Sequence, residues 1–196
     1  MKEYIIFSLG DLIKGGYTEE DLSPFFNDFT CEREKDLEMF LRNKAITYDN
    51  SNLGKTSLII DKSRFEDGKL DIMAFFTIGQ TSVDIGELSK NKKKKLLGSV
   101  PGRDKLLSYQ AYLIGQLGRS DKYTTDDISG EAILNECYAE IRKVQRVVGG
   151  RLLLLLLECR EHMYGKFYQK KGFEKLTESP DEQGLYTLYR RLKFDD

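Results

Sequence analysis

The clearest signal of architecture lies in residues Leu152–Leu176, which read LLLLLLECREHMYGKFYQKKGFEKL. The segment opens with six consecutive leucines, and two glycines precede them. Periodicity does not separate helix from strand in such a run, but its short length between glycines and the charged segment Glu158–Glu161 favours a strand. A strand without polar alternation is typical of the interior of an α/β sheet. We expect a helix over Glu161–Lys171, ended by Gly172.

The segments before the leucines predict a βαβ unit. Ser108–Leu117 has strand character, and Ser129–Val148 is a long amphipathic helix. The apolar face of this helix is formed by Ile133, Cys137, Ile141, Val144 and Val148. A strand, a helix and a second strand in this order place the two strands side by side and parallel. A single continuous helix over Leu152–Gly172 would contradict this interpretation.

The rest of the chain adds strands and helices on either side of this unit. Further strands are expected over Tyr4–Leu9, Thr56–Asp61, Leu70–Ile78, Phe173–Leu176 and Leu185–Leu192. Further helices are expected after Thr18, with Asp21 in a capping box, over Glu32–Tyr48, and within the ambiguous segment Asp84–Leu97. The predicted class is α/β, with a mixed central sheet of about seven strands flanked by helices on both faces. Without a repeat or linker, residues 1–196 are expected to form a single domain.

Composition narrows the function classes. With 31 basic and 32 acidic residues the net charge is -1, and 40% of residues are apolar. These values exclude disordered, collagen-like and membrane classes, and they argue against nucleic-acid binding through bulk positive charge. Three scattered cysteines and one histidine provide no metal site, so no metal is expected. Reduced thiols and the absence of a signal peptide or spanning segment indicate a cytoplasmic protein without a membrane partner.

Three pieces of the chain carry a family resemblance. YLIGQLGRSD (Tyr112–Asp121) leads through DDISGEAIL (Asp126–Leu134) into the long helix, and FYQKKGF occupies Phe167–Phe173. The third piece is FTCEREKDLEMFLRNKA at Phe29–Ala45. Together they resemble the GNAT superfamily of acyl-CoA-dependent N-acetyltransferases, and the third is similar to a bacterial branch that includes toxins of toxin–antitoxin pairs. The resemblance implies a GNAT-type fold, acetyl-CoA as cosubstrate, and in many such domains a homodimer.

The start of the long helix is the candidate phosphate site. Backbone N–H groups and the positive end of the dipole at Ser129 suit a pyrophosphate, and Gly130 permits close approach. Of the family's Gln/Arg-x-x-Gly-x-Gly/Ala turn only Gly130 remains, and Ile128 can supply its N–H only if its side chain points away. An alternative that needs no ligand is that the acids here cap the helix. These acids are Asp126, Asp127 and Glu131, and Arg119, Lys122 and Arg160 could offset their charge.

Further roles come from the resemblance. It implies that the backbone of Leu117, Gly118 and Arg119 binds the acyl-pantetheine arm, and that Tyr168 of the FYxxxGF motif protonates the departing thiolate. A phenol of pKa about 10 is a suitable acid for a thiolate whose thiol titrates near 8.5. The alternative is a tyrosine packed on the helix face. For the general base, Glu158, Tyr112 and a chain of waters remain open, whereas His162 and Cys159 are expected to be structural.

The function expected is transfer of an acetyl group from acetyl-CoA to a primary amine by direct attack in a ternary complex. The acceptor is a small molecule or a macromolecule. One alternative is a toxin-like enzyme acting on aminoacyl-tRNA, which the lysine run Lys92–Lys95 would help to bind. Another is a GNAT-like binding or regulatory module without turnover, because the phosphate turn departs from the family pattern.

Overall fold

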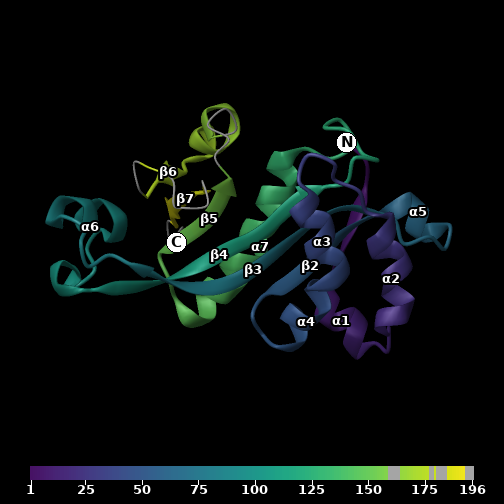
Figure 1. Ribbon diagram of the computed structural model, residues 1–196, viewed down its shortest axis with the longest axis horizontal. Helices are drawn as coiled ribbons and strands as arrows, with labels where there is room; N and C mark the ends of the chain where they lie inside the picture. Colours follow the sequence, from purple (N-terminus) through teal and green to yellow (C-terminus); the bar gives the residue numbers. More distant parts are fainter. Residues whose placement is uncertain (159–163, 177–178, 180–184, 193–196) are drawn as a thin grey trace. The chain divides into compact units, whose positions relative to one another are not determined.

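The structure is a computed structural model, and it describes residues 1–158, 164–176, 179 and 185–192 (Figure 1). The chain divides into two compact units. The first unit comprises Met1–Gly79 and Gly115–Lys143, and the second comprises Gln80–Ile114 and Val144–Asp196. Two strands and the longest helix contribute residues to both units, and the single-domain expectation stays a prediction.

The strands of the first unit begin with an antiparallel meander. β1 (Tyr4–Ser8) pairs with β2 (Lys55–Asp61), which pairs with β3 (Ile72–Asp84). A register shift between Ile59 and Ile60 marks a bulge in β2. With β4 (Ser108–Arg119) next to β3, the hydrogen-bonded order along the chain's strands is β1-β2-β3-β4-β5-β7-β6.

The helices of the first unit mostly lie between β1 and β3 in sequence. They are α1 (Leu9–Lys14), α2 (Glu19–Asp28), α3 (Lys35–Asn43), α4 (Ala45–Asn50) and α5 (Lys62–Glu66), followed later by α7 (Gly130–Val148). The capping box of Thr18 and Asp21 at the start of α2 is confirmed. The single helix expected over Glu32–Tyr48 is wrong, because the chain breaks at Lys44 into α3 and α4.

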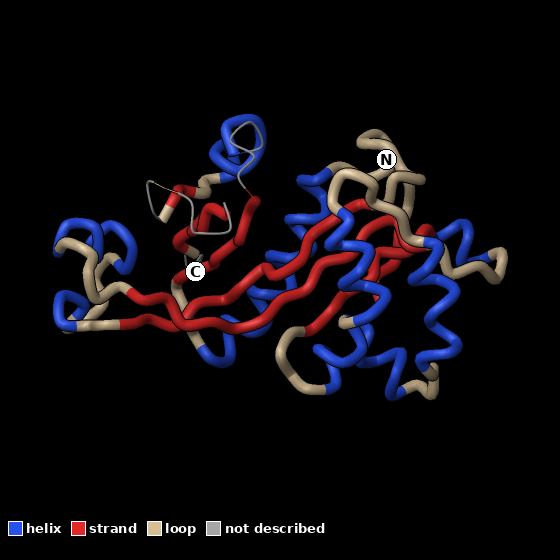
Figure 2. Tube along the Cα trace, viewed as in Figure 1, coloured by secondary structure: helices blue, strands red, loops and turns tan. Residues whose placement is uncertain are grey.

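Helices cover both faces of the first unit's strands, as expected for an α/β protein (Figure 2). Leu58 and Ile60 of β2 point to the face that packs against α1–α4. That core cluster comprises Leu9, Leu12, Leu22, Phe26, Phe29, Cys31, Phe40, Leu41, Ala45, Leu58, Ile60, Ile72 and Phe75. Ile59 points the other way and is also fully buried. On that side α7 lies behind the strands in Figure 1, and Tyr4 of β1 donates a hydrogen bond to Glu136 of α7 at 2.6 Å.

The second unit contains the parallel strand pair. β4 pairs in parallel with β5 (Leu152–Glu158), Tyr112–Ile114 lying opposite Leu153–Leu155. The predicted βαβ unit is therefore confirmed, and a continuous helix over the leucines is excluded. β5 pairs antiparallel with β7 (Leu185–Arg191), which pairs antiparallel with β6 (Glu174–Lys175).

Four short helical segments belong to the described part of the second unit. α6 (Lys90–Leu97) and η1 (Arg103–Lys105) lie between β3 and β4. After β5 the expected helix is replaced by a π-helical turn, η2 (Tyr164–Tyr168), and a 3-10 turn, η3 (Gln169–Lys171). Gly172 ends this segment as expected, with a left-handed φ of 78°. Residues 161–163 of the expected helix lie outside the described residues.

The apolar face predicted for α7 is shorter than expected. Ile133, Cys137 and Ile141 are buried, whereas Val144 and Val148 are 41% and 63% exposed. Among the described helices, none combines the length and the apolar character needed to cross a bilayer.

Candidate functional site

The start of α7 is a capped helix end. Ser129 Oγ accepts a hydrogen bond from the Ala132 N–H at 3.1 Å, and the Ser129 carbonyl accepts one from the Ile133 N–H at 3.2 Å. Ser129 is therefore the N-cap, and Gly130 is the first helical residue. Within the described part of the chain, the Gly130 N–H makes no hydrogen bond. A backbone donor at the positive end of a 19-residue helix remains available for an anion.

Ile128 is a bulky residue in the turn, and its side chain is buried. The side chain is 0% exposed, so it points into the protein and away from the helix end. Its carbonyl accepts a hydrogen bond from Arg119 Nη1 at 3.0 Å, and the same nitrogen lies 3.0 Å from Thr125 Oγ1. Arg119 thus spans the loop from the end of β4 to the start of α7. The sequence predicted a backbone role for Arg119 and missed this positioning role of its side chain.

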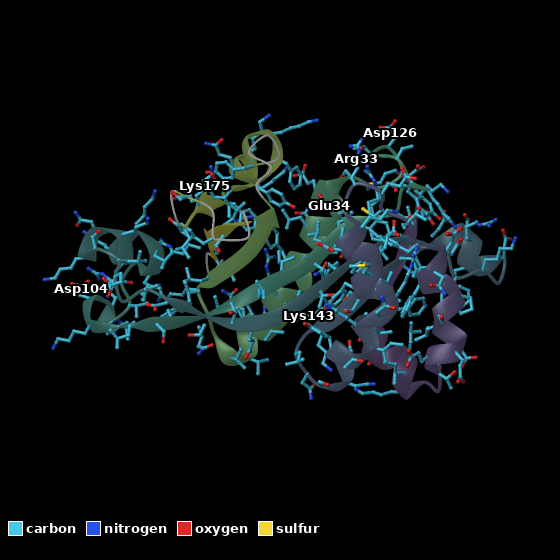
Figure 3. All side chains as sticks on the ribbon, in the orientation of Figure 1. Arg33, Glu34, Asp104, Asp126, Lys143 and Lys175 are labelled. Atoms are coloured by element: carbon cyan, nitrogen blue, oxygen red, sulfur yellow. The ribbon has the colours of Figure 1, made fainter. Side chains whose placement is uncertain are left out.

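The acidic residues at the turn differ in their surroundings. Asp127 Oδ2 accepts hydrogen bonds from the N–H and the hydroxyl of Thr124, both at 2.8 Å, and the Asp127 N–H donates to Thr124 Oγ1 at 3.3 Å. The backbone hydrogen bond is the main reason why the pKa of Asp127 is lowered. Asp126 is exposed at the surface of this loop (Figure 3). Asp127 therefore closes a turn with Thr124 ahead of the helix and does not cap α7, whose N-cap is Ser129. A Thr-x-x-Asp pattern could have shown this turn in advance.

The loop between β4 and α7 is fixed from a second side by the connection between α2 and α3. The Asp121 N–H donates to the Thr30 carbonyl at 2.7 Å, and Asp121 Oδ2 accepts from the Glu32 N–H at 2.6 Å. Lys122 forms an ion pair with Asp28. Lys122 is therefore engaged with α2, which is a different role from the expected one of offsetting the acids of the turn.

The end of β4 holds the three residues expected to bind the acyl-pantetheine arm. Leu117 is half-buried, and Gly118 is covered by Leu37 of α3. A Cβ atom at Gly118 would lie 2.3 Å from Leu37 Cδ1, so a larger residue here would require the Leu37 side chain to move. The pairing of β4 with β5 runs over Tyr112–Ile114, and Leu117, Gly118 and Arg119 extend the strand beyond it. These three residues and Ile128, Ser129 and Gly130 belong to the first unit.

Tyr168 belongs to the second unit and ends the π-helical turn. Its side chain is 7% exposed, and its ring makes edge contacts with Phe167 and Phe173 at centroid distances of 5.0 and 5.7 Å. The Tyr168 carbonyl accepts a hydrogen bond from the Phe173 N–H at 3.1 Å, across the left-handed turn at Gly172. The FYxxxGF motif is thus a compact aromatic turn that fixes the Tyr168 ring.

Of the residues considered as a general base, Tyr112 and Glu158 are both described by the structure. The Tyr112 hydroxyl donates to the Gly149 carbonyl, and burial raises the pKa of Tyr112. A Cβ atom at Gly150 would lie 2.7 Å from the Tyr112 ring, so this ring packs directly on the turn before β5. Tyr112 is therefore a structural anchor. Glu158 is the last residue of β5, and Cys159 and His162 lie outside the described residues.

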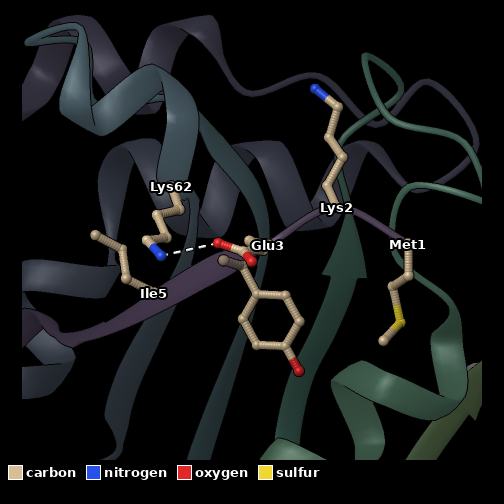
Figure 4. A pocket seen from close by; sticks show the side chains of 6 residues that line it. Met1, Lys2, Glu3, Ile5 and Lys62 are labelled. Carbon is tan, nitrogen blue, oxygen red and sulfur yellow. Dashed lines mark hydrogen bonds and ion pairs between the residues drawn. The ribbon is translucent and has the colours of Figure 1, made fainter.

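A second surface feature is a pocket beside the N-terminal strand, lined by Met1–Ile5 and Lys62 (Figure 4). Glu3 and Lys62 form an ion pair across it at 2.8 Å. Lys2 donates its backbone N–H to the Asp127 carbonyl and its ammonium group to Asp61, each within 2.9 Å. This strand thus supports the loop before α7. In the described part of the chain, no group of three or more His, Cys, Asp or Glu side chains could hold a metal ion.

The fold is similar to that of bacterial toxins of known structure, which agrees with the fold that the resemblance in the sequence implied. A crystal structure of a bacterial toxin matches with a TM-score of 0.71 at 14% sequence identity, over 97% of this chain and 92% of that chain. A tyrosine-to-phenylalanine mutant of KacT matches with a TM-score of 0.67 at 15% identity, over 95% and 94%.

AtaT complexed with acetyl-methionyl-tRNAfMet matches with a TM-score of 0.64 at 15% identity, over 94% of each chain. Other matching structures contain AtaT with the antitoxin AtaR, with acetyl-CoA or with DNA. No protein-family model and no curated protein sequence matches this chain. The mixed α/β class predicted from the sequence is confirmed.

Proposed function

We propose that this protein transfers the acetyl group of acetyl-CoA to the amino group of an aminoacyl-tRNA. The observation that carries the proposal is the match, over 94% of both chains, to a toxin bound to acetyl-methionyl-tRNAfMet. The matching complexes that contain acetyl-CoA support the cosubstrate. An aminoacyl-tRNA presents a primary amine, so this proposal is a specific case of the general amine acetyltransferase expected from the sequence.

The residues of the first unit would bind the cosubstrate. The Gly130 N–H and the positive end of α7 suit the pyrophosphate, and the buried Ile128 side chain leaves the turn accessible. The backbone of Leu117, Gly118 and Arg119 would hydrogen-bond the acyl-pantetheine arm, as an added strand does. The side chain of Arg119 holds the turn in the required shape through Thr125 and Ile128.

The chemistry needs one nucleophile and one acid. The neutral amine attacks the thioester carbonyl carbon, the C–S bond breaks, and the sulfur leaves with the bonding electron pair. Tyr168 would give its phenolic proton to that thiolate, and the proton lost by the amine would pass to water. Strand N–H groups near the carbonyl would stabilise the developing oxyanion, and the proximity of amine and thioester would supply much of the rate.

Calorimetric titration with acetyl-CoA tests the cosubstrate site. We compare the wild type with Gly130→Asp and with Gly130→Asn, which differ in a single charge. A carboxylate at the first helical position favours the helix dipole, so the fold is retained, while the same charge repels a pyrophosphate. We expect acetyl-CoA affinity to fall at least about tenfold more in Gly130→Asp than in Gly130→Asn. Ile128→Asp is a poorer test because it would bury a carboxylate.

Acetylation of a pool of aminoacyl-tRNAs, followed with radiolabelled acetyl-CoA, tests the reaction. Tyr168→Phe should retain acetyl-CoA binding and lose at least about 100-fold in turnover, within the usual range for a general acid. No acetyl-CoA binding by the wild type would overturn the proposal and favour the non-catalytic module. A module without turnover would also explain why an acid, Asp127, lies in the turn that would otherwise face a pyrophosphate.

A further inference from the structure

The connection between β3 and β4 is a basic arm, which we define as residues 85–107. It contains seven basic residues and two acidic ones, a net charge of +5. The whole chain carries -1, so the rest of the protein carries -6. In Figure 1 the arm extends beyond the ends of β3 and β4 within the second unit, with α6 on it and Asp104 near its tip in Figure 3. Charge is thus separated along the chain although the protein is nearly neutral.

The arm has its own apolar base. Leu96 and Leu97 of α6 are 1% and 0% exposed, and they share a core cluster with Val83, Ile85, Ala111 and residues of β5 and β7. Ser89 caps α6 by accepting a hydrogen bond from the Lys92 N–H at 3.3 Å. The apolar side of α6 is therefore fully used in packing, and the opposite side carries lysines.

The lysines of α6 fall into two groups. Lys93 is buried, and its ammonium group donates to the carbonyls of Leu106 and Asp104 at 2.8 and 3.4 Å. Lys95 forms an ion pair with Glu174 at 2.6 Å. Lys90, Lys92 and Lys94 have no acidic or hydrogen-bonding side-chain partner among the described residues.

The unpaired group is unfavourable for the helix itself. Lys90 and Lys94 lie one turn apart, and like charges at this spacing repel each other. Lys90 and Lys92 also lie in the first turn, where a positive charge opposes the helix dipole. Local stability therefore does not explain Lys90 and Lys92, although Lys94 lies in the last turn, where a positive charge suits the dipole. An external polyanion would relieve both unfavourable effects.

We propose that Lys90, Lys92 and Lys94 on the basic arm bind the phosphate backbone of the RNA acceptor. The proposal rests on the proposed function for the identity of that RNA. Lysines bind phosphate as point charges without base recognition, so this contact would add affinity and attract the acceptor electrostatically. A membrane is a poorer partner, because an interfacial helix needs a free apolar face and that of α6 is buried.

The test is binding of the full-length protein to fluorescently labelled, deacylated tRNA without acetyl-CoA, over a range of NaCl concentrations. In the triple variant Lys90→Gln, Lys92→Gln, Lys94→Gln, affinity at low salt should fall at least about tenfold. The slope of log K against log salt should become shallower by about 2–3, at roughly 0.7–0.9 per phosphate contact. The corresponding triple arginine variant should retain both.

The control is the triple variant Lys14→Gln, Lys44→Gln, Lys69→Gln, which changes the net charge equally at three exposed lysines outside the arm. Equal loss in both triple variants would overturn the proposal, since net charge would then explain binding. Stronger arm-dependent binding to phosphatidylserine vesicles than to tRNA would also overturn it. Calorimetry with acetyl-CoA on the same variants separates the two proposals, because loss of RNA binding with intact acetyl-CoA binding concerns the arm alone.

Discussion

At the scale of single residues, Gly118 shows how packing and the candidate site share one position. Leu37 of α3 covers the α-carbon of Gly118 so closely that a Cβ atom would lie 2.3 Å from Leu37 Cδ1. We expect Gly118→Ala to lower the free energy of unfolding by about 1 kcal/mol, the low end of the cost of overpacking, because the half-buried Leu37 side chain can move. Urea denaturation measures this loss. Leu37→Ala should make the glycine substitution nearly neutral, and equal losses in both backgrounds would contradict the steric cause.

Asp61 couples stability to pH through a lowered pKa. Burial would raise its pKa, but hydrogen bonds from Lys2, Ser63 and the Arg64 backbone outweigh burial and lower the pKa to about 2. A carboxylate with a lowered pKa stabilises the fold above the unfolded pKa near 4, and this contribution disappears as pH falls towards 2.

We therefore expect Asp61→Asn to lose about 2 kcal/mol of unfolding free energy at pH 7. The difference from the wild type should shrink below pH 4 and vanish near pH 2, which urea titrations at several pH values would show. Asp67→Asn, at an exposed turn position, is the control and should change little at any pH. A difference for Asp61→Asn that is constant with pH would indicate a cost of shape instead of charge.

At the scale of elements, adjacent lysines of α6 have opposite roles. Lys93 is 4% exposed and donates to two carbonyls at the end of the arm, whereas Lys94 is exposed and has no partner among the described residues. We expect Lys93→Met to destabilise the protein by about 1–3 kcal/mol, because the Asp104 and Leu106 carbonyls lose the charged donor that ties them to α6. Lys94→Met should stay within about 0.5 kcal/mol of the wild type. Similar melting temperatures for both variants would contradict this assignment.

Some elements follow from local sequence patterns, and others depend on contacts between residues far apart in the chain. The leucine strand, the capping box at Thr18 and the helix-ending glycine of the FYxxxGF motif are local patterns, and all three are confirmed. The break between α3 and α4 has a distant cause. Asp49 of α4 is 1% exposed and accepts hydrogen bonds from the Thr56 N–H and the Lys55 ammonium group of β2, at 3.1 and 3.0 Å. Helical periodicity carries no information about such a contact.

In the candidate site, too, local patterns could be predicted and distant contacts could not. Ser129 and Gly130 could be placed from the sequence because capping and helix polarity are local properties. The side-chain role of Arg119 could not, because it depends on hydrogen bonds to a loop whose path is set by Asp121 and Lys2. The catalytic role of Tyr168 and the binding roles of the cosubstrate residues stay predictions.

At the scale of the whole molecule, the proposed reaction has a consequence for a cell. An acetylated aminoacyl-tRNA has an amide in place of its free amine, and an amide nitrogen is a poor nucleophile for peptide-bond formation. Expression of the active protein should therefore arrest bacterial growth. Three parts of the protein would contribute separately: Tyr168 would serve the transfer, the start of α7 would bind the cosubstrate, and the basic arm would bind the RNA.

Growth on inducible expression tests this consequence with variants already described. Tyr168→Phe and Gly130→Asp should each relieve the arrest, because one removes the acid and the other repels the pyrophosphate. Gly130→Asn should relieve the arrest less than Gly130→Asp does, because it adds a side chain at the turn but no negative charge. The triple glutamine variant of the arm should weaken the arrest without abolishing it, since RNA affinity falls while transfer chemistry is intact. Immunoblots must show equal protein levels. Persistent arrest by Tyr168→Phe at an equal level would mean that toxicity does not come from acetyl transfer, and it would overturn the proposed role of this tyrosine.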